Sequence, residues 1–72
     1  MSKEFVQKIG LKIRIERQKQ GLSQEKLAEY SNLNRNSLSA IERGESVMSI
    51  ETLENIAKAL KLDIRELFNF VI

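Results

Sequence analysis

The stretch QEKLAEYSNLNRNSLSAIERG, residues 24–44, decides the fold of this chain. Apolar residues recur at helical spacing on both sides of a short link at residues 31–34, which predicts two short helices, about 24–31 and 35–43. Ala28 is the small residue where the two helices cross, and Asn32 tolerates the left-handed backbone that a tight corner needs. The apolar anchors behind the corner are Leu27, Leu33, Leu38 and Ile41. This pattern predicts a helix-turn-helix over about residues 24–43.

The sequence around this motif predicts three more helices, and it contains no Pro that would interrupt them. The first covers roughly residues 3–19 and ends before Gly21. The fourth begins after Ser49, and the fifth begins after Asp63, which is spaced as a capping box with Glu66 three residues later. Their inward faces are Phe5, Val6, Ile9 and Ile13 in the first, Leu53, Ile56, Ala57 and Leu60 in the fourth, and Ile64, Leu67, Phe68 and Val71 in the fifth. The expected fold class is all-α, a single five-helix domain over residues 1–72.

The composition excludes most enzyme chemistry. The 72 residues include no Cys and no His, and Asp63 is the single Asp, so the chain lacks disulfides, zinc ligands and the usual catalytic groups. We therefore expect no enzyme, no metal and no cofactor. The net charge of +2 is too small to name a partner. Because there is neither a secretory signal nor an apolar run of about 18 residues, we expect a cytoplasmic protein, complete or an excised domain, with no membrane partner.

Four features of residues 8–68 carry a resemblance to a known family. They are Ser23-Gln24, Leu27-Ala28, Ile41-Glu42-Arg43-Gly44 and the apolar stripe from Leu53 to Leu60. Together they are similar to the Cro and lambda-repressor-like helix-turn-helix family, also called the XRE family. One departure is Asn32, where the family more often has Gly, and Asn tolerates the same backbone. The resemblance implies a five-helix lambda-repressor-like DNA-binding domain.

The function that the resemblance implies is sequence-specific transcriptional regulation. Such a regulator binds a near-palindromic operator in double-stranded DNA as a homodimer, needs no small-molecule ligand and acts by occupying its site. Within the family, Ser31-Asn32-Leu33-x-Arg35 and the helix start at residues 49–53 look like controller proteins of restriction-modification systems. A phage-type repressor and an antitoxin-type autoregulator remain alternatives. So does a helical protein-interaction module without DNA binding, although the polar tip at residues 34–36 argues against it.

The candidate site residues follow from the third helix, which enters the major groove in such a fold. Arg35 has the donors for guanine and Asn36 those for adenine. The full set of base-contact candidates is Asn34, Arg35, Asn36, Ser39 and Ala40. By resemblance, the phosphate-contact candidates are Gln24, Ser37, Arg43 and Ser46, with amide donors at the start of the second helix. The resemblance also implies a structural ion pair between Arg17 and Glu42.

Two apolar features predict an interface beyond the domain core. Leu11 and Ile15 lie opposite the inward face of the first helix, and residues 63–72 end in a hydrophobic tail. One interpretation is that the tail packs across the first helix and is seated on Leu11 and Ile15. The other is a homodimer, because two copies double the base contacts of one motif. The interface candidates are Leu67, Phe68, Phe70, Val71, Ile72, Leu11 and Ile15.

Overall fold

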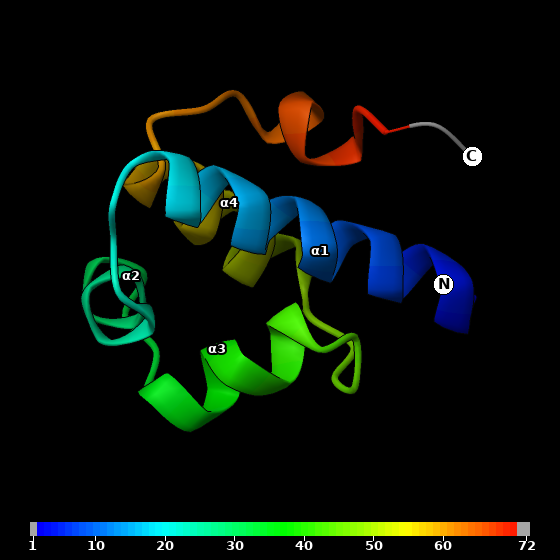
Figure 1. Cartoon of the computed structure of the whole chain (residues 1–72). Helices are drawn as coiled ribbons and strands as arrows, with labels where there is room; N and C mark the ends of the chain where they lie inside the picture. Colours follow the sequence, from blue (N-terminus) through cyan, green and yellow to red (C-terminus); the bar gives the residue numbers. More distant parts are fainter. Residues whose placement is uncertain (1, 71–72) are drawn as a thin grey trace.

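The computed structural model describes residues 2–70 and is all-helical over that part, which confirms the predicted fold class. Four α-helices, α1 (Lys3–Lys19), α2 (Gln24–Tyr30), α3 (Arg35–Glu42) and α4 (Ile50–Ala59), precede a 3₁₀ helix, η1 (Ile64–Phe68). The long helix α1 lies between η1 on one side and α2 and α3 on the other, with α4 behind it (Figure 1). This arrangement leaves α2 and α3 together at one end of the molecule.

The helix starts agree with the caps that the sequence contains. The side chains of Ser23, Asn34 and Ser49 each accept a hydrogen bond from a backbone N–H in the first turn of the following helix, at 3.0, 2.7 and 3.1 Å. Each cap satisfies an amide that would otherwise lack a partner. Gly21 and Gly44 end their helices with φ values of +70° and +72°.

The predicted fifth helix is the one element whose type was wrong. Asp63 and Glu66 do form the capping box, but η1 is a 3₁₀ helix with bonds such as Glu66 N–H to the carbonyl of Asp63 at 2.9 Å. A five-residue segment is too short to gain from the α-helical pattern, and 3₁₀ turns commonly serve such connections. Val71, which was expected on its inward face, and the interface candidate Ile72 lie outside the described residues.

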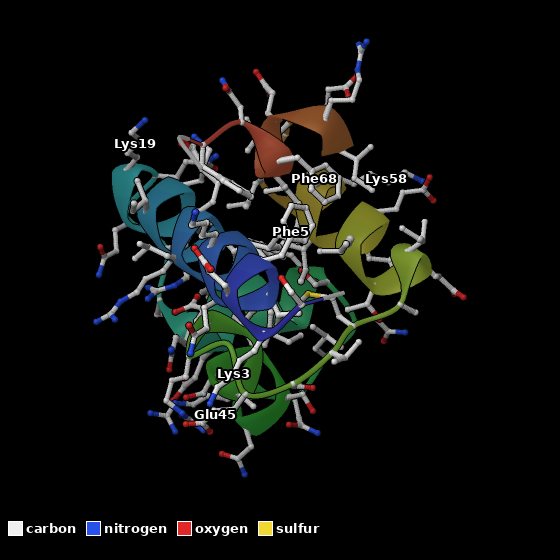
Figure 2. The ribbon with its side chains drawn as sticks, turned by 90° about the vertical axis from the view of Figure 1, so that its right-hand side faces the viewer. Lys3, Phe5, Lys19, Glu45, Lys58 and Phe68 are labelled. Carbon is white, nitrogen blue, oxygen red and sulfur yellow. The ribbon has the colours of Figure 1, made fainter. Side chains whose placement is uncertain are left out.

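The segment after η1 packs on α1 through three aromatic rings. Phe5 stacks on Phe68, with ring centroids 6.0 Å apart, and meets Phe70 edge-on at 5.6 Å. Figure 2 shows Phe5 and Phe68 side by side between α1 and η1. The seat of the tail is therefore Phe5 and not Leu11 or Ile15, which stay 53% and 40% exposed. Phe68 and Phe70 thus pack on a different part of α1 than Leu11 and Ile15, and the homodimer interface stays a prediction.

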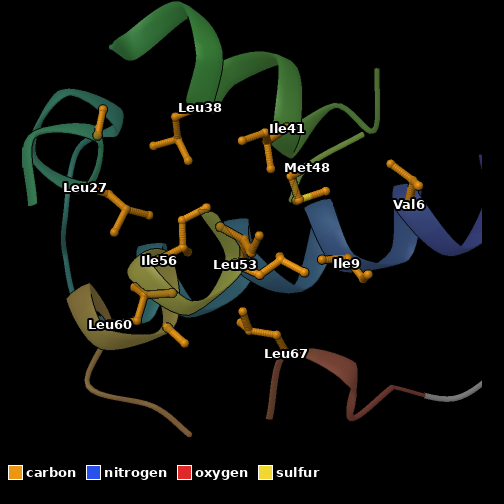
Figure 3. Close-up of a cluster of buried hydrophobic side chains, with 13 residues drawn as sticks. Val6, Ile9, Leu27, Leu38, Ile41, Met48, Leu53, Ile56, Leu60 and Leu67 are labelled. Atoms are coloured by element: carbon orange, nitrogen blue, oxygen red, sulfur yellow. The ribbon is translucent and has the colours of Figure 1, made fainter. Parts of the chain in front are cut away.

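The core gathers the apolar stripes of all four helices and one residue of η1 (Figure 3). Its buried apolar members are Val6, Ile9, Ile13, Leu27, Ala28, Leu38, Ile41, Met48, Leu53, Ile56, Ala57, Leu60 and Leu67. Leu67 is completely buried inside one chain, so it offers no surface to a second copy and is removed from the interface candidates. The predicted inward residues Phe5, Leu33, Ile64 and Phe68 pack against the edge of this core and are only partly buried.

Gly10 lets α1 and α3 approach closely. No role was predicted for this residue from the sequence. A Cβ atom built on Gly10 would press against the carbonyl oxygen of Ile41 and lie 2.9 Å from that of Glu42. Any larger residue would therefore push the end of α3 away from α1. An isolated Gly inside a helical pattern usually has such a packing reason, so its position was the available signal.

Candidate nucleic-acid interface

The corner between α2 and α3 is fixed by backbone hydrogen bonds. Asn32 adopts the predicted left-handed conformation, with φ of +59°. Its N–H donates to the carbonyl of Glu29 at 3.2 Å, and the N–H of Leu33 donates to that of Ala28 at 2.8 Å. These two bonds are a Schellman motif, which satisfies the last carbonyls of α2 and sets the direction in which α3 leaves. Leu27 and Ala28 are buried behind the corner.

The first turn of α3 presents polar side chains to solvent. Arg35 and Asn36 are exposed, and neither side chain bonds to another residue within 2–70. Asn34 is different, because its Oδ1 accepts the N–H of Ser37 at 2.7 Å as the helix cap. A bidentate contact to adenine uses both amide atoms, so Asn36 is free for such a contact while Asn34 keeps only its amino group.

An ion pair ties α1 to the end of α3. Arg17 Nε donates to Glu42 Oε2 at 2.7 Å and Nη2 to Oε1 at 3.1 Å, and both residues are buried. The guanidinium also donates to the carbonyl of Leu22 at 2.7 Å. Two parallel bonds to a carboxylate fix the geometry as well as the charge. The pair implied by the resemblance is thus present, and it holds α3 against α1.

Gln24 joins the same network. Its Nε2 donates to Glu42 Oε1 at 3.0 Å, so Glu42 orients the amide of this phosphate-contact candidate at the start of α2. The carbonyl oxygen and the second amide hydrogen of Gln24 are not used by this bond. Gln24 and the Arg17–Glu42 pair were predicted as separate features, but the structure brings them together.

Arg43 makes two contacts at the other end of α3. Its Nη1 donates to Ser39 Oγ, one turn earlier, and its Nε lies 3.1 Å from Glu45 Oε1. No role was predicted for Glu45, because ion pairing between residues 43 and 45 depends on the turn at Gly44. The four-residue spacing of Ser39 and Arg43 was the only signal.

A shallow hollow beside α3 brings five candidates together. Its polar lining consists of Asn34, Asn36, Ser37, Ser46, Ser49 and Thr52, and Ala40 contributes to its wall. Ser37 and Ser46, the weaker phosphate candidates, thus lie next to the base-contact candidates. Arg35, Ser39, Gln24 and Arg43 do not line this hollow.

Three of the six basic residues of α1 pair with acids of the same helix. Lys8 pairs with Glu4 at 3.3 Å, and Glu16 lies between Lys12 at 3.6 Å and Lys19 at 3.1 Å. The hydrogen bond from Lys19, followed by the charge of Lys12, lowers the pKa of Glu16. Lys3 and Arg14 have no ion pair within residues 2–70, so α1, with six basic and two acidic residues, keeps a net positive charge.

Residues 2–70 contain neither a membrane-spanning helix nor a cluster of metal-binding side chains. No helix in that range is long and apolar enough to cross a membrane. Within the same residues, no three side chains of the types that bind metals come together.

A sequence profile described as helix-turn-helix matches residues 13–67. The chain belongs to this helix-turn-helix family of DNA-binding transcriptional regulators. It is 42% identical over 62 residues to the control protein C.BamHI of Bacillus amyloliquefaciens, an alignment that covers 85% of this chain and 76% of the relative. It is also 33% identical over 60 residues to a competence pilus inhibition repressor of Acinetobacter baylyi, covering 83% of this chain and 54% of that protein.

Solved structures of family members have the same fold. The crystal structure of the restriction-modification controller protein C.AhdI from Aeromonas hydrophila matches with a TM-score of 0.86 and 40% identity, over 88% of this chain and 96% of that one. The controller protein C.Esp1396I matches with a TM-score of 0.82 and 36% identity, over 89% and 83% of the two chains. These relatives of our helix-turn-helix protein are regulators and not enzymes, as expected for a chain without His or Cys.

Proposed function

We propose that this helix-turn-helix regulator binds a near-palindromic operator in double-stranded DNA as a homodimer and controls the genes of a restriction-modification system. One observation carries the proposal. Arg35 and Asn36, whose side chains can read guanine and adenine, stand free at the start of a helix that the Arg17–Glu42 ion pair holds in place. A helix held rigidly by its scaffold can present base-reading side chains in a defined register.

The contacts to the DNA backbone would flank this tip. Gln24 is oriented by Glu42 at 3.0 Å, and Arg43 stands at the opposite end of α3. Ser37 and Ser46 lie beside Asn36 in one hollow. Such contacts fix the register of the protein on the duplex, while the bases supply the specificity. A cytoplasmic location fits this proposal, because an operator-binding regulator acts where the DNA is.

The dimer is supported by the small size of the reading surface. The eight residues of α3 reach one half-site, and a two-fold dimer doubles the contacts. Phe68 and Phe70 are engaged with Phe5, whereas Val47 and Ile50 are 72% and 68% exposed on the segment that follows α3. We therefore place a second copy against Val47 and Ile50, because pairing there would fix the distance between the two recognition helices.

The controller role is supported by two likenesses. The chain is similar to C.BamHI and to C.AhdI, and each alignment covers most of both aligned chains. The likeness favours a controller over a phage-type repressor or an antitoxin. Neighbouring genes for a restriction enzyme and its methyltransferase would support this role, and their absence would contradict it.

A selection from random duplexes tests the site. We expect one enriched near-palindromic motif. Arg35→Ala should weaken binding by about 1–3 kcal/mol and relax the preference at one base pair, whereas Gln24→Ala should weaken all duplexes alike. Arg14→Ala is a matched control, because Arg14 is an exposed Arg of α1 without an ion pair within residues 2–70. It should leave the motif unchanged.

Two results would contradict the proposal. A selection without an enriched motif would remove the sequence-specific function and favour a protein-interaction module. Sedimentation equilibrium that shows only monomer at micromolar concentration, with and without the selected duplex, would remove the homodimer. Ile50→Glu should produce that monomer if the second copy sits where we place it.

A further inference from the structure

The backbone of Glu45 is held in place directly after α3. The N–H of Gly44 donates to the carbonyl of Ile41 and the N–H of Glu45 to that of Ala40, each at 3.0 Å. This is the same pair of bonds that ends α2, and it turns the chain sharply at Gly44, whose φ is +72°. Glu45 is therefore held beside Arg43 by the geometry of the helix end and not by chance contact of two long side chains.

Arg43 lies on the face of α3 that carries the reading residues. It follows Ser39 by four positions and Asn36 by seven, which places the three on one face of the helix. Its guanidinium is engaged by Ser39 Oγ and by the Glu45 carboxylate. The side chains of Arg43 and Glu45 are 53% and 61% exposed, so the ion pair is open to solvent and to a ligand.

A groove beside this pair carries a second cation. Lys3, Gln7, Arg43, Gly44 and Glu45 line it between the start of α1 and the turn after α3. Figure 2 shows Lys3 and Glu45 at the same end of the molecule. Lys3 has no ion-pair partner within residues 2–70. Two cations thus flank one carboxylate, and a phosphate group would suit the same position by charge and by its acceptor oxygens.

We propose that Glu45 competes with the DNA backbone for Arg43. In the free protein the Glu45 carboxylate holds the guanidinium, and on DNA a phosphate replaces it, with Lys3 beside it. This inference rests on the proposed function, because it requires a duplex bound along α3. The carboxylate must give up its partner and then lies near phosphates of like charge, and both effects weaken binding to any sequence. Glu45 would therefore raise the protein concentration at which the operator is filled without changing which operator is chosen.

The test measures dissociation constants of four proteins for the selected operator and for a random duplex. The proteins are wild type, Glu45→Gln, Arg43→Gln and the double variant. We expect Glu45→Gln to bind both duplexes about three- to fivefold more tightly, the upper part of the range of one exposed ion pair. The gain should shrink as salt is added, because salt screens exposed charges. It should disappear in the Arg43→Gln background.

Glu54→Gln is the matched control. Glu54 is also an exposed glutamate beside a cation, with Lys58 at 4.0 Å, but it belongs to α4. Its removal changes the net charge equally and should leave both dissociation constants unchanged. Thermal melting of each variant confirms that the same fold is compared.

Three results would overturn the inference. Weaker binding by Glu45→Gln would mean that Glu45 orients Arg43 for the DNA. An equal gain with and without Arg43 would show general charge repulsion and no competition. Equal affinities of Glu45→Gln and Glu54→Gln would show that Glu45 has no particular effect. If wild type prefers no duplex, the proposed function fails, but the comparison on random DNA still decides the role of Glu45.

Discussion

Replacing Gly10 with Ala would test how closely α1 and α3 approach. On helix propensity alone, Ala inside α1 would be more stable than Gly by about 1 kcal/mol. The added Cβ would press on the carbonyl oxygen of Ile41 and lie 2.9 Å from that of Glu42. Adding a methyl group to a filled site typically costs about 1–3 kcal/mol, and backbone carbonyls cannot rotate away as a flexible side chain can.

The steric effect should therefore exceed the gain in propensity. We expect Gly10→Ala to lower the free energy of unfolding by about 2 kcal/mol. This value is a packing cost of about 3 kcal/mol, the upper end of the usual range, less the propensity gain of about 1 kcal/mol. In a domain of this size that corresponds to a melting temperature about 8–16 °C lower. Urea unfolding followed by circular dichroism gives both quantities. Gln18→Ala, at an exposed position of the same helix, is the control and should be neutral.

The prediction has a clear refutation. If Gly10→Ala is as stable as wild type, or more stable, the two helices do not approach as closely as the structure shows. The same substitution should also weaken DNA binding, because the Arg17–Glu42 pair spans the same two helices. A variant that loses stability and keeps full affinity would show that the position of α3 does not depend on this contact.

Two further predictions concern the segment between α4 and η1. Lys61 has a left-handed backbone, with φ of +60°, which strains any residue with a Cβ atom. Lys61→Gly should therefore stabilise the protein by about 0.5–1 kcal/mol, measured by urea unfolding. A loss of stability would show that the backbone at Lys61 is not strained. The hydrogen bonds from Arg65 lower the pKa of Asp63 from 3.8 to about 2. A carboxyl group whose pKa is lower in the folded state stabilises the protein at pH values above its unfolded-state pKa. The contribution of Asp63 should therefore be lost as the pH falls from 3.8 towards 2. Asp63→Asn should flatten that acid dependence, and an NMR titration of Asp63 with a midpoint near 3.8 would refute the interaction.

The local features of the fold were accessible from the sequence. Caps such as Ser23 and Asn34, and the left-handed Asn32, are properties of short segments, and the apolar stripes reported the core directly. The type of η1 was not accessible, because a spacing of three and four residues fits one short turn of either helix. Lys61 shows a second limit, since its side chain gives no sign that the chain turns left-handed there.

The contacts between distant segments were the part that sequence could not supply. The phosphate-contact candidates were predicted one residue at a time, but Gln24 is bonded to Glu42 and Arg43 is paired with Glu45, and both relations require the folded chain. One of the two interpretations placed the tail on Leu11 and Ile15, because they are apolar and outward, whereas the aromatic rings of the tail pack on Phe5. Periodicity identifies which face of a helix is apolar, but it does not identify the partner.

The aromatic contact of Phe5 with Phe68 and Phe70 has a consequence for the order in which the protein opens. It joins the first turn of α1 to the last residue of η1 and to Phe70, more than 60 residues later in the sequence. Contacts between remote segments form late in folding, because the intervening chain must first be ordered. The amides of the first turn of α1 and those of η1 should therefore exchange with solvent as one cooperative unit, while α2 and α3 remain closed. Such fraying would leave α3, the proposed recognition helix, in place.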